Sequence, residues 1–270
     1  MTLETVAREG LVLLGCGKMG SALLAGWLEA GLPASAVWVI EPNPTGWLKG
    51  TGVHLNEGIP PAPAVALLAV KPQMMGAALP VLQALGNGTT LFVSIAAGTT
   101  IATFEAALGP RTPIVRTMPN TPAMVGRGIT AITGNAHATP AHLALARELM
   151  ASVGQVVTLE GEHQIDAVTA VSGSGPAYVF HLIEAMAAAG VAQGLSPEVS
   201  MQLARATVCG AGELAHRSPE SAEQLRINVT SPGGTTAAAL QVLMEPQTGF
   251  PALLDRAVKA AADRGRELGK

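Results

Sequence analysis

The sequence predicts an α/β protein in which a doubly wound sheet is followed by an all-helical C-terminal domain. Short apolar runs alternate with helical stretches in the first half, a pattern typical of a parallel sheet with helices on both faces. A glycine-rich segment directly follows the first apolar run. Beyond residue 160 the strand signal stops, and only helical patterns remain. These observations divide the chain into a sheet-forming part and a helical part.

Five apolar runs predict the central strands of the sheet, because each has the length of a buried strand. They lie at residues 11–14, 36–40, 64–70, 91–96 and 113–118. Helices are expected between them at 21–30, 73–85 and 99–108. Two further strands, at 127–133 and 155–159, flank a helix at about 140–152. The sheet is therefore expected to end before residue 160.

The helical part is expected to contain helices at 163–185, 197–216, 235–244 and 250–268. We accordingly assign residues 1–162 to a dinucleotide-binding domain and 163–270 to a helical substrate-binding and oligomerisation domain. The stretch 176–190 is apolar on nearly all sides, so several of its faces must be buried. We expect a second subunit to cover it across a two-fold axis. The alternative is that it packs centrally within its own domain.

Composition excludes several classes of function. Only 13% of the 270 residues are charged, the net charge is −3, and no basic stripe is present, which argues against nucleic-acid binding. No apolar stretch of about 18 residues suggests a membrane span, and residues 1–10 do not resemble a secretory signal. Cys16 and Cys209 lie in unrelated contexts and predict neither a disulfide nor a metal site. A cytoplasmic setting is expected.

The segment GCGKMG at 15–20 has the G-x-G-x-x-G spacing of a Rossmann-like dinucleotide-binding turn. Gly15 permits the tight turn, Gly17 lets a pyrophosphate approach the backbone, and Gly20 lets helix and strand pack closely. The helix that begins there offers free N–H groups and its positive dipole end. We predict that the cofactor contacts Gly15, Gly17, Lys18, Met19 and Gly20. The alternative is a glycine-rich turn that binds nothing.

Glu41 ends the second strand and is the candidate for cofactor discrimination. An acidic residue there can accept hydrogen bonds from the ribose hydroxyls of NAD. It would repel the 2′-phosphate of NADP by about 1–4 kcal/mol at contact distance. Pro42 and Pro44 can instead turn the side chain to solvent, and Asn43 is a neutral partner for either cofactor. The sequence leaves NADH against NADPH open.

Segments after the third, fourth and fifth strands should line the cofactor's path, because ligands of such sheets lie at the carboxyl ends of strands. The Asn120 side chain is a candidate partner of the nicotinamide amide, with an Asx-turn as the alternative. Lys71 can equally be a surface charge. The candidate cofactor residues from these segments are Ala69, Val70, Lys71, Pro72, Ala97 and Asn120.

The segment SGSGP at 172–176 is expected to break the first long helix of the helical part. Its glycines permit close backbone approach, and Pro176 suits the first turn of a resumed helix. We interpret the segment as a wall of the substrate or nicotinamide site, with Ser174 as a candidate catalytic residue. The alternative is a kink that serves packing.

The segment 231–236 (SPGGTT) precedes the helix expected at 235–244. Gly233 and Gly234 leave backbone N–H groups unshielded, and the helix start adds partial positive charge. The hydroxyl groups of Thr235 and Thr236 are further donors. The segment therefore predicts a cradle for a carboxylate, built without a cationic side chain. The alternative is a helix cap without a ligand.

Taken together, these segments resemble the pyrroline-5-carboxylate reductases, the last enzymes of proline biosynthesis. The resemblance spans almost the whole chain and rests on GCGKMG, AVKPQ, SIAAG, VRTMPNTPA, DAVTAVSGSGPAYVF, IEAM and NVTSPGGTT. It implies a Rossmann domain and a helical domain that interlaces into homodimers, often assembled into decamers. It also implies that the substrate carboxylate is bound by Ser231, Gly233, Gly234 and Thr236. Two departures are Glu41, which differs from the small or polar residues usual there, and SPESAEQL, which leaves Glu220 without an assigned role.

The resemblance implies hydride transfer from NADPH or NADH to the C=N carbon of a cyclic imino acid, which gives L-proline. A protonated imine is already electrophilic, and the Thr236 hydroxyl is the candidate partner of the ring nitrogen. One alternative is a hydroxyacid dehydrogenase of similar plan, which needs a Lys or His acid on the helical domain. After residue 160 the lysines are Lys259 and Lys270, both near the end. The other alternative is a dinucleotide-sensing protein without turnover.

Overall fold

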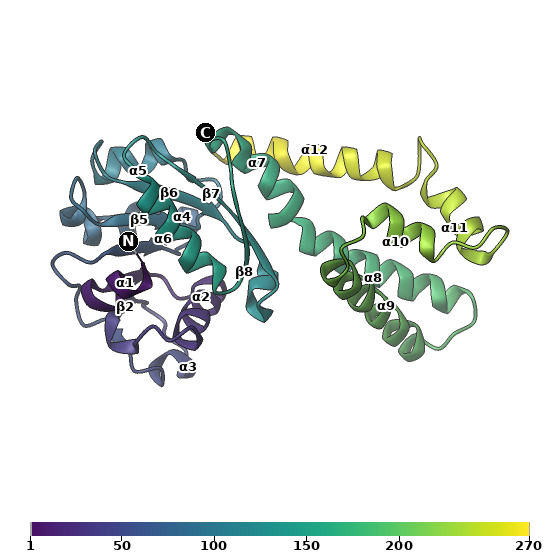
Figure 1. Ribbon diagram of the computed structural model, residues 1–270, viewed down its shortest axis with the longest axis horizontal. Helices are drawn as coiled ribbons and strands as arrows, with labels where there is room; N and C mark the ends of the chain where they lie inside the picture. The colour runs from purple at the N-terminus through teal and green to yellow at the C-terminus, as the bar shows by residue number, and fades with distance from the viewer. Residues whose placement is uncertain (1, 270) are drawn as a thin grey trace. The chain divides into compact units, whose positions relative to one another are not determined.

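The computed structural model describes residues 2–269 and divides into two compact units. The first unit comprises the residues up to 173 together with those from 261 onward, and the second comprises 174–260. In Figure 1 the first unit contains the sheet and its flanking helices, in purple to teal, whereas the second consists of helices alone. Each unit is described separately below.

The sheet has eight strands in the order β3-β2-β1-β4-β5-β6-β7-β8. Its first six members pair in parallel, β7 is antiparallel to β6, and β8 is parallel to β7. The β6–β7 connection is too short for a crossover helix, which parallel strands require, and it therefore reverses the chain. The predicted α/β fold class is confirmed. The strands are β1 (Leu11–Leu14), β2 (Val37–Ile40), β3 (His54–Leu55), β4 (Val65–Leu68), β5 (Leu91–Ser94), β6 (Ile114–Met118), β7 (Gly128–Gly134) and β8 (Gly154–Thr158).

Helices cover both faces of the sheet (Figure 1), and the central strands β1, β4 and β5 are buried on both sides. Leu11 and Leu13 of β1 point into one apolar cluster, and Val12 and Leu14 point into the other. The first cluster includes α2 and α6, which a hydrogen bond from the Trp27 indole to a backbone carbonyl joins at 2.9 Å. The helices of this unit are α1 (Leu3–Glu9), α2 (Lys18–Glu29), α3 (Gly46–Lys49), α4 (Pro72–Ala78), α5 (Ile101–Leu108) and α6 (Pro140–Ala151).

The α-helix is interrupted at SGSGP, as expected: α7 ends at Val168 and α8 begins at Gly175 with Ser174 as its N-cap, within a helical stretch that runs from 162 to 192. Within it, residues 169–173 form a π-helical turn. The hydroxyls of Thr169 and Ser172 donate to carbonyl oxygens four residues earlier, at 2.8 and 3.1 Å. Pro176 lies at the start of α8, where the backbone N–H is not needed. The glycine-rich segment therefore interrupts the α-helix with a wider turn, after which the helix resumes.

The remaining helices of the C-terminal part match the expectation, with one addition. The helix α10, which begins after the Ser221 cap, was not predicted because it is short. The helices are α7 (Ile165–Val168), α8 (Gly175–Ala192), α9 (Pro197–Arg217), α10 (Ala222–Asn228), α11 (Thr235–Leu243) and α12 (Phe250–Leu268).

The division between the two units differs from the domain boundary expected at 162/163. Ile165 and Ala170 are buried in the sheet-containing unit, so the start of the long helix belongs to that unit. The end of α12 also returns to it, where Gly265 lies against Asp166 and Leu268 lies against Gly98. Residue 162 therefore marks the end of the sheet-forming segment, and the second compact unit begins at Ser174.

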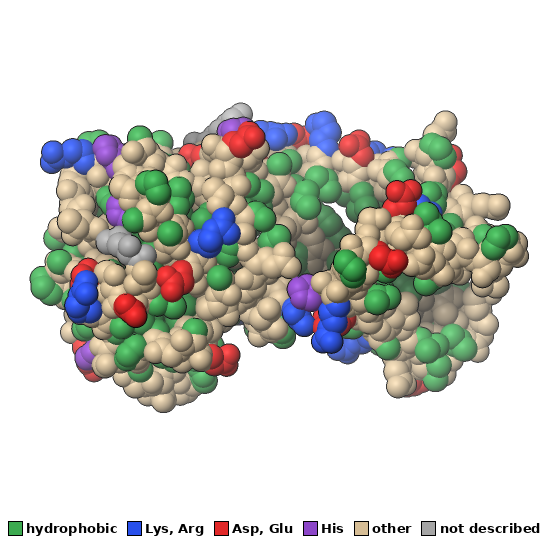
Figure 2. Space-filling view, viewed as in Figure 1, with side chains coloured by type: hydrophobic (Ala, Val, Ile, Leu, Met, Phe, Trp, Pro, Cys, Tyr) green, Lys and Arg blue, Asp and Glu red, His purple; other side chains and the backbone are tan. Residues whose placement is uncertain are grey.

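The helical unit leaves much of its apolar surface exposed. Between residues 174 and 260 the buried hydrophobic side chains are only Ala187 and Ala204. Phe180 is 60% exposed and Val242 is 71% exposed, and Figure 2 shows apolar side chains on the surface of this unit. Two buried alanines cannot stabilise a unit of this size, because stability comes mainly from apolar area removed from water.

The helix at 162–192 is also long and apolar enough to cross a membrane, on length and composition alone. No such stretch was expected from the sequence, because polar residues interrupt the apolar run. Averaged over an 18-residue window, however, the mean hydropathy reaches 1.2, and only 6% of that window is buried. An apolar surface of this length is unfavourable in water and needs a covering partner.

Candidate active site

The glycine loop after β1 has the geometry that close approach of a dinucleotide requires. A Cβ atom on Gly20 would lie 2.7 Å from the Gly15 carbonyl oxygen, so only glycine lets α2 pack this closely on the strand end. Gly15 has a φ of +89°, which side chains disfavour. A Cβ on Gly17 would meet nothing within 4 Å, so its backbone faces open space. Each of the three glycines is thus needed for a different local reason: Gly20 for close packing, Gly15 for its backbone conformation, and Gly17 for an open approach to the backbone.

The start of α2 is free to bind an anion. Gly17 is its N-cap and has no side chain to satisfy the first N–H groups of the helix. The Ser21 hydroxyl instead donates to the Cys16 carbonyl at 3.0 Å, which ties the loop to the helix. Lys18 is exposed in the first turn and Met19 packs against the core. These features fit the diphosphate of NAD(P)H.

The Glu41 side chain is not turned to solvent by its flanking prolines. One carboxylate oxygen accepts a hydrogen bond from the Cys16 N–H at 2.8 Å. The other accepts one from the Asn43 N–H at 2.9 Å. Glu41 therefore lies beside the glycine loop, whereas the Asn43 side chain is exposed.

Asn56 positions Glu41 and was not singled out from the sequence. Its side-chain oxygen accepts from the Glu41 N–H, and its side-chain amide donates to the Glu41 carbonyl, both at 2.9 Å. Asn56 has a φ of +57°, a left-handed conformation in which Asn is enriched. The sequence Asn-Glu-Gly at 56–58 indicates a turn. Nothing in that stretch, however, indicates that the Asn56 side chain bonds to the backbone of Glu41.

The sheet order brings the other candidate cofactor residues to the same edge. The strands β2, β1, β4, β5 and β6 are neighbours and parallel, so the segments after them emerge together. Ala69 and Val70 follow β4, Lys71 is the exposed N-cap of α4, Pro72 is its first residue, and Ala97 is exposed after β5. Among residues 2–269, no group of three or more His, Cys, Asp or Glu side chains could hold a metal ion.

Asn120 is buried after β6, and its side-chain oxygen is already engaged. That oxygen accepts from the Ile129 N–H at 2.9 Å, which ties the end of β6 to the start of β7. This contact is structural in character, although it differs from the Asx-turn considered as the alternative. A role toward the nicotinamide remains a prediction.

The substrate candidates lie in the helical unit. Gly233 has a φ of +68° with open space around it. Gly234 is the N-cap of α11, and no side chain caps that helix. Thr235 and Thr236 occupy its first turn, the former exposed and the latter half-buried. The Ser231 carbonyl accepts from the Gly234 N–H at 3.0 Å and closes the turn.

Ser174 lies at the N-cap position of α8, immediately after the π-helical turn. Its backbone is helical, with φ −83° and ψ −23°, and its side chain caps nothing. The hydroxyl is half-buried. Its catalytic role likewise remains a prediction.

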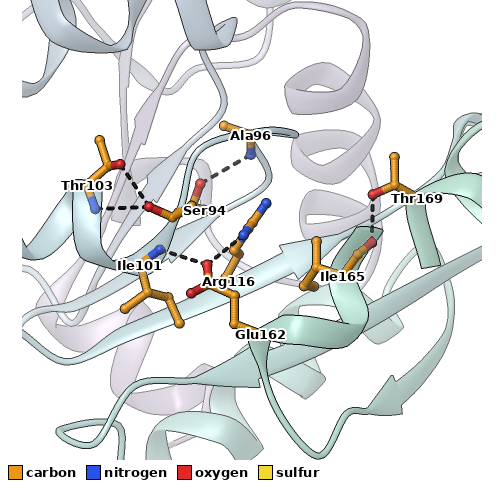
Figure 3. Close-up of polar contacts among 9 residues, drawn as sticks. Ser94, Ala96, Ile101, Thr103, Arg116, Glu162, Ile165 and Thr169 are labelled. Atoms are coloured by element: carbon orange, nitrogen blue, oxygen red, sulfur yellow. Dashed lines mark hydrogen bonds and ion pairs between the residues drawn. The ribbon is translucent and has the colours of Figure 1, made fainter. Parts of the chain in front are cut away.

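An ion pair between a buried arginine and a half-buried glutamate holds the start of the long helix against the sheet. Arg116 of β6 pairs with Glu162 at 2.5 Å, and the same carboxylate oxygen accepts from the Ile101 N–H at 2.8 Å. Figure 3 shows the two side chains pointing toward each other beside the first residue of α5. The Arg116 side chain is only 5% exposed. β6, α5 and the segment before α7 are thereby joined at one carboxylate.

The chain matches two family models. The one described as pyrroline-5-carboxylate reductase dimerisation covers residues 162–268. The one described as NADP oxidoreductase, coenzyme F420-dependent, covers residues 10–98. The boundary of the first match falls at Glu162, where the ion pair lies.

Relatives match over nearly the full length. The chain is 40% identical to the pyrroline-5-carboxylate reductase of Pseudomonas aeruginosa, over 96% of this chain and 97% of the relative. It is also 40% identical to that of Mycobacterium tuberculosis, over 96% of each. The chain belongs to the pyrroline-5-carboxylate reductase family. It is therefore an NAD(P)H-dependent oxidoreductase.

Solved structures of pyrroline-5-carboxylate reductases agree with this assignment. The Coxiella burnetii protein superposes with a TM-score of 0.89 at 33% identity, over 97% of this chain and 99% of that one. The Plasmodium falciparum protein, solved with NADP bound, gives 0.80 at 30% identity with the same coverage. The dimerisation match shows that the helical unit serves oligomerisation, which accounts for its exposed apolar surface.

Cys16 should be an unreactive thiol in the folded protein. Burial raises the pKa of the Cys16 thiol. The hydrogen bond between the thiol and the Ser21 hydroxyl lowers this pKa, whereas the negative charge of the Glu41 carboxylate raises it further. Because the thiolate is the nucleophile, we expect iodoacetamide to leave Cys16 unmodified at about pH 8 in the native protein and to modify it in urea. Peptide mass spectrometry measures both, with the Cys209 peptide of the denatured sample as the standard for complete labelling. Modification of native Cys16 at the rate of a free thiol would contradict this.

Glu162→Gln should destabilise the protein by about 2–4 kcal/mol, because it leaves the buried Arg116 charge without a counter-ion. Urea unfolding at fixed protein concentration measures the change. Adding Arg116→Met should recover part of the loss, since the uncompensated charge is removed. Glu267→Gln breaks the exposed Arg264–Glu267 pair and is the matched control, expected to leave stability unchanged. Equal effects of Glu162→Gln and Glu267→Gln would show that the buried pair has no special role.

Proposed function

We propose that this chain reduces 1-pyrroline-5-carboxylate to L-proline by hydride transfer from NAD(P)H, the final step of proline biosynthesis. The observation that carries the proposal is the match to curated pyrroline-5-carboxylate reductases over 96% of the chain. The glycine loop and the uncapped α11 supply the two anion-binding features that this reaction needs. The dehydrogenase alternative is not favoured by any of these observations.

The sheet-containing unit is proposed to hold the cofactor. Backbone N–H groups at the start of α2 bind the diphosphate, and the glycine loop lets it approach. When bound, the nicotinamide supplies the hydride. Candidate contacts along the strand ends are Gly15, Gly17, Lys18, Met19, Gly20, Glu41, Asn43, Ala69, Val70, Lys71, Pro72, Ala97 and Asn120.

The loop before α11 is proposed to hold the substrate carboxylate. The first N–H groups of α11 have no capping side chain, and the left-handed Gly233 shapes the turn that exposes them. The segment 228–240 contains no Lys or Arg, so the carboxylate is recognised by backbone N–H groups, the helix dipole and hydroxyls. The residues proposed for this role are Ser231, Gly233, Gly234, Thr235 and Thr236.

Catalysis in this proposal is mainly positioning. The imine carbon of a protonated substrate is already electrophilic, so the site has to place it against the hydride donor and exclude water. The Thr236 hydroxyl hydrogen-bonds the ring nitrogen, and Ser174 forms part of the wall around it. Neither residue has to act as a strong acid.

The oligomer is proposed to be a homodimer formed through the helical unit, placed in the cytoplasm. Support comes from the dimerisation match at 162–268 and from the exposed apolar side chains there. A partner subunit, and not a lipid bilayer, then covers the helix at 162–192. Assembly of dimers into a decamer is the further step implied by the family, and light scattering of the purified protein distinguishes the two masses.

Purified protein should oxidise NADH or NADPH in the presence of 1-pyrroline-5-carboxylate and form proline. Absorbance at the nicotinamide band and chromatography of the product measure both sides of the reaction. Neither cofactor should be consumed with 2- or 3-oxo acids, the substrates of the dehydrogenase alternative. Cofactor binding without turnover on any of these compounds would instead support the sensing protein.

Thr236→Ala should lower kcat/KM for the imino acid by about ten- to a hundredfold, the effect of losing a hydrogen bond to a charged group. The dissociation constant of the reduced cofactor should stay unchanged, because Thr236 contacts only the substrate in this proposal. Steady-state kinetics and calorimetry measure the two quantities. Thr207→Ala, which removes a hydroxyl from the exposed face of α9, is the matched control. Equal losses in turnover and cofactor binding would mean that Thr236 is structural.

A further inference from the structure

We infer that Glu41 makes this enzyme select NADH over NADPH. The inference rests on the proposed function only in assuming that the glycine loop binds a nicotinamide dinucleotide. It concerns the adenosine end of that cofactor, which is distant from the chemistry.

The carboxylate is held rigidly at the glycine loop. The Cys16 N–H reaches one oxygen at 2.8 Å and the Asn43 N–H reaches the other at 2.9 Å. The Glu41 backbone is fixed in turn by two hydrogen bonds with the Asn56 side chain. Two backbone donors leave the carboxylate little freedom to swing away.

Each oxygen still has capacity to accept a further hydrogen bond. A carboxylate offers about four lone-pair sites, and the structure uses one on each oxygen. A ribose carries two neighbouring hydroxyls, at positions 2′ and 3′, which donate to two such acceptors. The adenosine ribose of NADH therefore matches the unfilled capacity of Glu41.

A 2′-phosphate does not match the unfilled acceptor capacity of Glu41. The phosphate presents only acceptor oxygens and negative charge to a fixed carboxylate, and sites for NADP commonly supply an Arg in this region. Residues 41–48 contain neither Lys nor Arg, and the next cation along the chain is Lys49, the exposed last residue of α3. The Thr45 hydroxyl already accepts from the Leu48 N–H as the cap of α3. No cationic side chain in this segment offsets the repulsion.

The preference for NADH over NADPH follows from residues of this chain and does not rest on any relative. The Plasmodium falciparum structure was solved with NADP bound and is only 30% identical. A competing interpretation is that Glu41 merely ties the glycine loop to β2. In that case removal of the Glu41 carboxylate weakens the binding of NADH and NADPH equally, because the geometry of the glycine loop serves both cofactors.

The test measures the dissociation constants of NADH and NADPH by calorimetry without any imino acid, for the wild type, Glu41→Gln and Glu41→Ser. Glu41→Gln retains an acceptor for the Cys16 N–H and removes the charge. Glu29→Gln, at the opposite end of α2 and exposed, changes the net charge equally and is the control. Because no substrate is present, the result is independent of whether the chain reduces 1-pyrroline-5-carboxylate.

We expect the wild type to bind NADH at least about tenfold more tightly than NADPH, the effect of one like-charge contact near a protein surface. Both Glu41 variants should bring the ratio close to one or reverse it, whereas Glu29→Gln should leave it unchanged. Equal affinities or a preference for NADPH in the wild type would overturn the inference, even if neither variant folded. A parallel loss of both affinities in Glu41→Gln would also overturn it and would assign Glu41 to loop structure.

Discussion

The contact between Gly20 and the Gly15 carbonyl oxygen determines how close α2 comes to the carboxyl end of β1. A Cβ at residue 20 would lie 2.7 Å from that oxygen, which no side chain tolerates without displacing the helix. The close approach places the uncapped start of α2 at the strand end and turns the Cys16 N–H toward Glu41. The proposed diphosphate and ribose contacts therefore both depend on the absence of a side chain at Gly20. A substitution at Gly20 would displace the start of α2, whereas one at Glu41 would remove only the carboxylate that bonds to the loop.

The sheet was largely predictable because its strands are buried on both faces. Runs such as 11–14 and 65–68 are apolar at every position, and their lengths leave little room for another interpretation. The direction of β7 and the two-residue β3 were not predictable, since pairing partners distant in sequence decide them. The interruption of the helix near 172–176 was predicted, but its form, a π-helical turn at 169–173, was not, because glycines near a proline indicate only that a break occurs. The outcome depends on hydroxyls that bond back to carbonyls within the same helix.

The polar contacts that position the site were the least accessible from sequence. Arg116 lies in an otherwise apolar strand, so a buried partner was needed, yet the motif does not show that Glu162 supplies it. Asn56 and Glu41 are likewise separated along the chain, and their pairing follows from the parallel alignment of β2 and β3. The glycine fingerprint could be singled out locally because its spacing within one short segment is itself the signal, and Glu41 because it ends a strand at a fixed distance from that segment. Motifs thus indicated the candidate groups, and the fold was needed to find what holds those groups in place.

The two anion-binding features draw their rigidity from different sources. The glycine loop is supported by a core that buries whole strands, so its geometry is set within one chain. The loop before α11 belongs to a unit whose buried hydrophobic side chains are two alanines. Its order must come largely from apolar surface covered in the oligomer, in agreement with the dimerisation match. In the proposed function, cofactor binding is then a property of the single chain and substrate binding a property of the assembly. Changes at the subunit interface would therefore disturb the loop before α11 before they disturb the glycine loop.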